Sequence, residues 1–424
     1  MLAEESQMPS RVAVSTLHDT RTAAHELADR LEAARGPDLS TAMLLVASFH
    51  HRAALPEAFD LLRGTYRPQA AVAVTTVGVV GGGRLHEGMP ALAILLLDEP
   101  GLEAAAIAIT PDLGPPAAWS ATRRGEVFGG GLETGFEDDS GPRRSSRVRT
   151  VLWADPFSSD PPGLAAAGAG RLVHGGVLSG SSQAGGNTLI SATLDEPARV
   201  AAEGAVGLAL RGARATAVAQ SGARPIGRSH VVTAADGSRL IGLGGRPVLD
   251  VLRETLESTG EAPPLDAEAP MGGLAIGIAV DEHRPDGRDP ICRLRPMTGI
   301  APPPRGSPPG TPPGLRLAEP IRPGRTVRFH LRDSRWASEA LQSSLDEQAI
   351  DLATAPAALV AISAAREIAD PLEGDAEGVH PAEFGGAMGI GLRTAGEFVD
   401  LGGHSELDTL STSTLVFEGP PSLA

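Results

Sequence analysis

The sequence predicts a mixed α/β fold (α/β with α+β character) in two domains, whose mixed sheets are covered by helices. Three observations predict it. The chain has 424 residues, more than one hydrophobic core usually fills. Its first part alternates short apolar runs with amphipathic helical segments, and glycine-rich segments further along join short apolar runs as in hairpins. An α/β/β/α layering with internal duplication is one arrangement that fits these patterns.

The first elements follow the order strand, helix, strand, helix, strand. The strands are short apolar runs, and the first helix places alanine and leucine on one face. Asp19 or Thr20 is its expected N-cap, and Gly36 with Pro37 ends it. This βαβαβ order favours parallel strand pairs. The expected elements are strands at 12–15, 42–49 and 70–74 and helices at 19–35 and 55–62.

Three similar units of strand, glycine-rich loop and strand indicate internal duplication. Glycine richness alone is the alternative explanation, because the chain has 52 glycines. The units are 78–88 before a strand at 91–97, 173–187 before a strand at 188–194, and 394–403 before a strand at 412–417.

The chain divides into two expected domains near residue 246, where a helix at 247–257 precedes a proline-rich break. Residues 111–150 and 300–320 have the composition of surface insertions. We expect the proline-rich stretch 300–320 to be an extended loop. The expected segments are a disordered N-terminus at 1–10, a first domain at 11–245 with an irregular insertion at 111–150, and a second domain at 246–424 with a proline-rich loop at 300–320.

Composition excludes several classes of function. No lysine occurs, so all 36 basic residues are arginine, and neither a lysine Schiff base nor a Walker-type lysine is possible. A net charge of −16 disfavours nucleic acid as a partner. Cys292 is the single cysteine, which excludes an intrachain disulfide or a cysteine-based metal site and fits a reducing cytoplasm. Without a signal sequence or a long apolar run, we expect a cytoplasmic protein that does not insert into membranes.

The first candidate ligand site is the glycine loop Gly81, Gly82, Gly83 and Arg84, followed by His86 and Glu87. Consecutive glycines let backbone N–H groups approach an anion, and the arginine can clamp a carboxylate. The alternative is a hairpin turn whose glycines supply positive φ angles.

The second candidate site contains Glu397, Gly402, Gly403 and His404. The Glu397 carboxylate is suited to a ligand amine and the two glycines to a ligand carboxylate, so both loops together would suit an amino acid. The alternative is an exposed turn. We expect neither a cofactor nor a metal, because the pair His50 and His51 has no partner at a recognisable metal-ligand spacing.

A set of motifs between residues 11 and 417 resembles the FIST family, named for F-box and intracellular signal transduction proteins, with FIST N and FIST C domains. The resemblance implies a bacterial sensory module that binds a small ligand, often proposed to be an amino acid, and it brings no catalytic residues. The motifs are Ala47-Ser48-Phe49-His50, Val77 to Arg84, Ala154-Asp155-Pro156-Phe157, Gly204 to Leu210, Arg224-Pro225-Ile226-Gly227, Leu243 to Pro247, and Gly396-Glu397 before Gly402-Gly403.

Three functions remain open from the sequence. The first is a small-ligand sensor without an output domain of its own, which passes occupancy to a separate signalling protein. The second is a hydrolase or transferase that uses a loop carboxylate and a histidine, although no Gly-x-Ser-x-Gly elbow or dinucleotide fingerprint is present. The third is a scaffold that binds only protein.

Overall fold

The structure is a computed structural model, and it describes most of the chain in thirteen segments. These are residues 10–32, 40–99, 101–130, 132, 148–260, 273–281, 291–306, 308–348, 350, 355, 357–364, 389–401 and 404–418.

Residues 10–97 form one compact repeat of alternating strands and helices. In its sheet the strand order is β1-β6-β2-β3, and β2 and β3 are the parallel pair. Asp19 is the N-cap of the first helix, because its carboxylate accepts a hydrogen bond of 2.8 Å from the Thr22 amide. The elements are β1 (Ser10–Ser15), α1 (Thr20–Glu32), β2 (Ala42–Ser48), η1 (Phe49–Ala54), α2 (Leu55–Tyr66), β3 (Ala70–Thr76), β4 (Gly78–Gly81), β5 (Arg84–Glu87) and β6 (Leu92–Leu97).

A second repeat has the same topology. Its strand order is β7-β12-β8-β9, with β8 and β9 parallel and the other neighbours antiparallel. Its elements are β7 (Glu103–Ile109), η2 (Pro111–Leu113), η3 (Pro116–Ala118), α3 (Ala121–Gly129), β8 (Arg149–Ala154), α4 (Pro161–Ala167), β9 (Leu172–Leu178), β10 (Leu189–Thr193), β11 (Arg199–Ala201) and β12 (Ala205–Arg211).

A third repeat again has this order, β13-β24-β21-β22, with β21 and β22 parallel. The internal duplication expected from the sequence is therefore present as three repeats. The elements of the third are β13 (Ala215–Ser221), α6 (Ser334–Glu347), β21 (Ala357–Ser363), β22 (Gly389–Leu401), β23 (His404–Asp408) and β24 (Ser411–Phe417).

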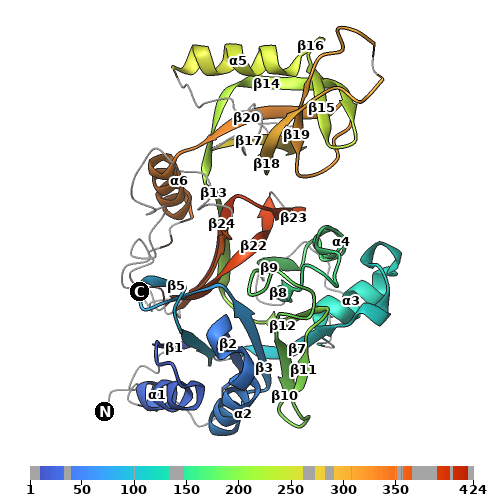
Figure 1. The fold of residues 1–424 in the computed structure, drawn as a ribbon. Coiled ribbons are helices and arrows are strands. Elements are labelled where there is room, and N and C mark those ends of the chain that lie inside the picture. The colour runs from blue at the N-terminus through green and yellow to red at the C-terminus, as the bar shows by residue number, and fades with distance from the viewer. Residues whose placement is uncertain are drawn as a thin grey trace.

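In each repeat, a hairpin strand pairs with a strand of a neighbouring repeat, and these pairings connect the three repeats in a closed ring. Strand β10 of the second repeat pairs with β3 of the first, and β4 of the first pairs with β22 of the third. The later part of β22 pairs with β9 of the second, which closes the ring. The three parallel-strand units thus surround a pseudo-threefold axis, and Figure 1 shows them as three lobes below the upper domain.

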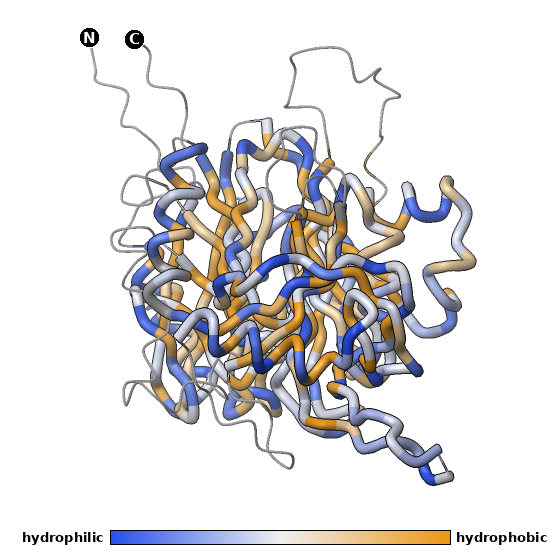
Figure 2. Tube along the Cα trace, turned by 90° about the horizontal axis from the view of Figure 1, so that it is seen from above, coloured by the Kyte–Doolittle hydropathy of each residue, from blue (hydrophilic) through white to orange (hydrophobic). Residues whose placement is uncertain are grey.

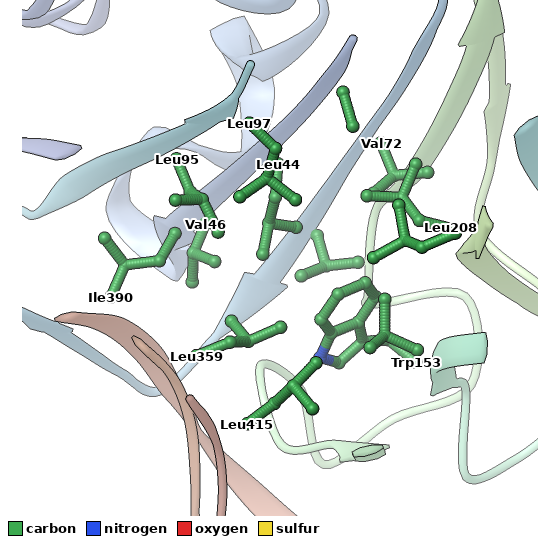
Figure 3. Close-up of a cluster of buried hydrophobic side chains, with 14 of the residues drawn as sticks. Leu44, Val46, Val72, Leu95, Leu97, Trp153, Leu208, Leu359, Ile390 and Leu415 are labelled. Atoms are coloured by element: carbon green, nitrogen blue, oxygen red, sulfur yellow. The ribbon is translucent and has the colours of Figure 1, made fainter. Parts of the chain in front are cut away.

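The three repeats share one hydrophobic core. Leu44, Trp153, Leu208, Leu359 and Leu415 come from all three repeats, and each is 2% exposed or less. Figure 3 shows these side chains pointing toward one another between the sheets. A gap lined by Leu44, Leu208 and Leu359 within this core has a volume of about 10 Å³, which is too small for a metabolite.

Helices cover the outer faces of the sheets. The apolar faces of α1 and α2 pack on the first repeat, α3 and α4 on the second, and α6 on the third. Apolar residues consequently lie along the inner strands in Figure 2, with polar residues on the outer helices and loops. The mixed α/β class, with mixed sheets covered by helices, is confirmed.

A six-stranded β-barrel is inserted between β13 and α6, at the top of Figure 1. The barrel closes because β14 pairs with both β20 and β15. Its elements are β14 (Ala223–Asp236), β15 (Arg239–Leu243), β16 (Arg246–Pro247), α5 (Val248–Thr259), β17 (Leu274–Asp281), β18 (Ile291–Ala301), β19 (Gly314–Leu317) and β20 (Thr326–Arg332).

The expected segments lie as follows in this architecture. The expected boundary between the two domains, at residues 245 and 246, falls inside the barrel, between β15 and β16. The stretch 111–150, expected to be irregular, contains α3, and the expected proline-rich loop at 300–320 contains β19, which pairs with β15 and β18. Residues 1–9 lie outside the described residues, and Ser10 begins β1.

Candidate functional site

The glycine loop of the first repeat is a hairpin. Gly82 and Gly83 form the two-residue turn with φ angles of 60° and 71°, and Gly81 pairs with Arg84 across it. Positive φ at both turn residues matches the twist of the strands and costs little at glycine. The hairpin alternative therefore accounts for both glycines, and the Arg84 side chain on this turn is exposed.

Of the other polar residues of this hairpin, His86 contacts the hairpin itself and Glu87 contacts another repeat. His86 Nε2 lies 3.1 Å from the carbonyl oxygen of Gly81. The Glu87 carboxylate lies 3.4 Å from the guanidinium of Arg393 on β22, in the third repeat. The Arg393 side chain is 4% exposed, and it also donates a hydrogen bond of 2.7 Å to the carbonyl oxygen of Ser363. A buried arginine is therefore reached by a carboxylate that is one-third exposed.

The three repeats meet at one backbone atom next to this ion pair. The hydroxyl groups of Thr76 and Ser179 each donate a hydrogen bond of 2.7 Å to the carbonyl oxygen of Arg393. Thr76 ends β3, Ser179 follows β9, and Arg393 lies on β22, so each repeat contributes one residue. The carboxyl ends of parallel strands commonly hold ligands in α/β proteins. We call Thr76, Ser179, Arg393 and Glu87 the axial centre.

Glu397 is fully buried further along β22. The Thr394 hydroxyl lies 2.6 Å from its Oε1, and Ser411 Oγ lies 3.3 Å from its Oε2. Burial raises the pKa of Glu397 well above its ordinary value, and Asp408, its register partner on β23, raises it further.

Asp408, the other carboxyl group of this pair, is surrounded by backbone amides that favour its charged form. Its carboxylate accepts hydrogen bonds from the backbone amides of Thr409, Leu410 and Leu294, at 2.6, 3.0 and 3.2 Å. Burial raises the pKa of Asp408 as well, but these amides and Arg295 oppose the shift. Of the two carboxyl groups, Glu397 is therefore the one whose neutral form is favoured more strongly.

The structure does not bring the two predicted loops together. Gly81 pairs with Ile390 at one end of β22, whereas Glu397 lies seven residues further along this strand, roughly 23 Å away. Gly402 and Gly403 lie outside the described residues, and His404 is the first residue of β23. Among the predicted site residues, Glu87 contacts the arginine of the axial centre.

Comparison with known proteins gives the family of this chain. Residues 41–246 match the FIST N domain. An uncharacterized protein of Mycobacterium tuberculosis strain H37Rv is 30% identical over 424 residues, covering 96% of this chain and 98% of that protein. The chain belongs to the FIST N domain family. An uncharacterized protein of Mycobacterium bovis is 28% identical over 420 residues, with the same coverage of both chains.

The FIST N match covers only part of the axial centre. It extends from the residue before β2 to the first residue of β16, and so includes Thr76, Glu87 and Ser179. Arg393 lies beyond it, in the third repeat. The signal for Arg393 in the sequence is its position as the one charged residue in the apolar run 389–394.

A second polar group fixes the loop after Ser179 in the FIST N region, and it includes Asp155 of the motif Ala154-Asp155-Pro156-Phe157. The Asn187 side chain donates a hydrogen bond of 2.8 Å to Asp155, and both residues are fully buried. A Cβ atom at Gly180 would stand 2.8 Å from Asn187 Oδ1, so glycine is needed there. Asp155 also accepts hydrogen bonds of 3.0 Å from the amides of Phe157 and Ser158.

Other predicted features have local roles. His51 lies 3.0 Å from the Thr20 hydroxyl at the start of α1, and burial lowers its pKa. Within the described residues, no cluster of three or more histidine, cysteine, aspartate or glutamate side chains is arranged to hold a metal. Among the helices described, none is long and apolar enough to span a membrane.

Proposed function

We propose that this FIST protein is a cytoplasmic sensory module that binds a small zwitterionic metabolite, such as an amino acid, at the axial centre. The observation that carries the proposal is the pairing of buried Arg393 with partly exposed Glu87 at 3.4 Å. This separation is longer than the 2.7–2.9 Å usual for a charge-assisted hydrogen bond. The guanidinium suits a ligand carboxylate, and Glu87 suits a ligand ammonium group.

The position of the centre explains how binding is transmitted. Thr76, Ser179 and Arg393 belong to three repeats, so a ligand that moves Arg393 changes contacts of all three. Such a ligand acts by favouring one of two conformations. In this proposal residues 246–424 complete the module as its FIST C part.

The receiving partner is a separate signalling protein. Phe49 and Phe157 are 43% and 47% exposed, and they follow β2 and β8, which are equivalent strands of two repeats. Exposed phenylalanines favour a protein contact at these positions. The exposure of Phe49 and Phe157 also supports the alternative function, a scaffold that binds a partner protein and no small ligand.

The enzyme alternative has less support from the described contacts. His86 faces the Gly81 carbonyl, and His174 contacts Ser413 Oγ at 2.9 Å. Burial lowers the pKa of His174 to about 3, so this imidazole stays neutral and is a poor general base at neutral pH.

Thermal unfolding against a panel of amino acids, organic acids and nucleotides tests the proposal. A ligand at 100 times its dissociation constant stabilises the folded state by about 2.7 kcal/mol. We expect a selective rise in Tm for zwitterions that carry both a carboxylate and an amine. A flat response across the panel, with a normal unfolding transition, would reject the sensor function in favour of the scaffold.

A further inference from the structure

A hollow on the outer side of the second repeat is separate from the axial centre. It is open to solvent, has a volume of about 170 Å³ and lies between α3 and the end of α4. Among the residues that the structure describes, its walls are small residues and two arginines, without a carboxylate. The lining residues are Ala121, Arg124, Gly125, Ala166, Ala167, Ala169 and Arg171.

Arg171, in the wall of this hollow, has one hydrogen-bond donor without a partner in the part of the chain that the structure describes. Its Nη1 is buried and has no hydrogen-bond partner among the described residues. A guanidinium is always charged in proteins, and a buried donor without a partner is costly. Gly125 leaves room beside the group, since a Cβ atom at this position would lie 3.9 Å from Arg171 Nη2.

The charges around the hollow favour an anion. On α3, Glu126 pairs with Arg123 at 3.7 Å, and neither residue lines the hollow. On α4, the Asp160 carboxylate caps the helix start by accepting a hydrogen bond of 3.1 Å from the Gly163 amide. The N-terminus of α3 begins at Ala121, a wall residue, and adds a partial positive charge.

We propose that this hollow is a second binding site, for a compact anion with carboxylate or phosphate chemistry. Arg171 supplies a buried donor and Arg124 an exposed one, and the small walls exclude larger groups. The site is independent of the axial centre. Arg171 precedes β9 and Ser179 follows it, so this strand separates the two residues by roughly 26 Å.

Isothermal titration of the full chain with inorganic phosphate and with acetate, at constant ionic strength, tests the proposal. We expect saturable binding of at least one anion, and comparison of the two distinguishes phosphate from carboxylate. Arg171→Gln should weaken the binding about tenfold or more, because charge-assisted hydrogen bonds are lost. Arg171→Lys keeps the charge without the planar fork and should fall between the wild type and Arg171→Gln.

Arg123→Gln is the matched control, because it removes one positive charge from the same helix outside the hollow. It should bind the anion as the wild type does. Equal weakening by Arg123→Gln and Arg171→Gln would show general charge screening and overturn the proposal. Failure of the wild type to bind either anion would also overturn it. A Tm for each variant without anion shows whether Arg171→Gln is folded, and if it is not, Arg171→Lys and Arg124→Gln decide the question.

Discussion

The Thr76 hydroxyl donates a hydrogen bond of 2.7 Å to the carbonyl oxygen of Arg393, although the two residues are 317 positions apart and belong to different repeats. Ser179 of the remaining repeat donates to this same oxygen. The point where the three repeats meet is thus a polar contact inside a largely apolar assembly. Its loss should affect how the repeats are held together as well as any bound ligand.

Removing the Thr76 hydroxyl should therefore destabilise the fold. Thr76→Val keeps the shape of the side chain and leaves the Arg393 carbonyl with one donor fewer, at an expected cost of about 1–2 kcal/mol. Urea unfolding of the wild type and of Thr76→Val measures this difference in unfolding free energy. Ser179→Ala should cost less alone but more in the Thr76→Val background, because the carbonyl then loses both donors. Strictly additive costs would show that the shared acceptor does not link the repeats.

The carboxyl pair on β22 and β23 predicts a pH dependence of stability. Because the pKa of Glu397 is raised in the folded state, the native protein binds more protons than the unfolded chain above pH 4.5. Stability should therefore fall as the pH rises from about 4.5 toward the raised pKa. Glu397→Gln mimics the protonated form and should flatten the slope of unfolding free energy against pH. A slope equal to that of the wild type would contradict a raised pKa of Glu397 in the folded state.

Glu99 predicts a similar effect in a narrower window. Glu99 lies in the chain between β6 and β7, and burial raises its pKa to about 7. Its Oε2 accepts a hydrogen bond of 3.4 Å from the backbone amide of Arg214. The stability it contributes is present at low pH and is lost as the pH rises from about 4.5 to 7. Glu99→Gln should raise the Tm at pH 8 but leave it near the wild-type value at pH 4. A variant less stable at pH 8 would show that the ionised carboxylate is the favourable form.

The shared core predicts that one truncation weakens the whole assembly. Leu44 is 1% exposed and packs with residues of all three repeats. Leu44→Ala should cost about 2–5 kcal/mol, from lost burial and the cavity left behind. Calorimetry should show the three repeats unfolding together at a lower temperature. Separate transitions for the repeats would contradict a common core.

The local elements of this fold were predictable from sequence, because their patterns depend on near neighbours. The buried run 42–48 and the helix capped by Asp19 form where periodicity and capping place them. The glycine units indicated a duplication as well. The cyclic exchange of hairpin strands was not predictable, since pairing of β10 with β3 joins segments more than a hundred residues apart. Barrel closure by β14 depends on long-range pairing in the same way.

The candidate site was predictable only in part, for the same physical reason. Glu87 was identified from its glycine-rich surroundings, but its partner Arg393 is brought to it by the pairing of β4 with β22. Glycine at 82 and 83 is explained by turn geometry, which a sequence pattern does not separate from an anion-binding loop. Glu397 has the chemistry of a binding group, yet its position in a fully buried strand is a consequence of tertiary packing.

The affinity of a zwitterionic ligand found in the panel, measured by isothermal titration, tests the central claim most directly. Arg393→Gln should weaken binding about 100-fold, because a buried charged donor is lost from the ligand carboxylate. Arg84→Gln, on the exposed turn of the same region, should change the affinity less than threefold. Circular dichroism establishes that both variants fold. Weakening by Arg84→Gln with little effect of Arg393→Gln would contradict the account and place the carboxylate at the glycine turn.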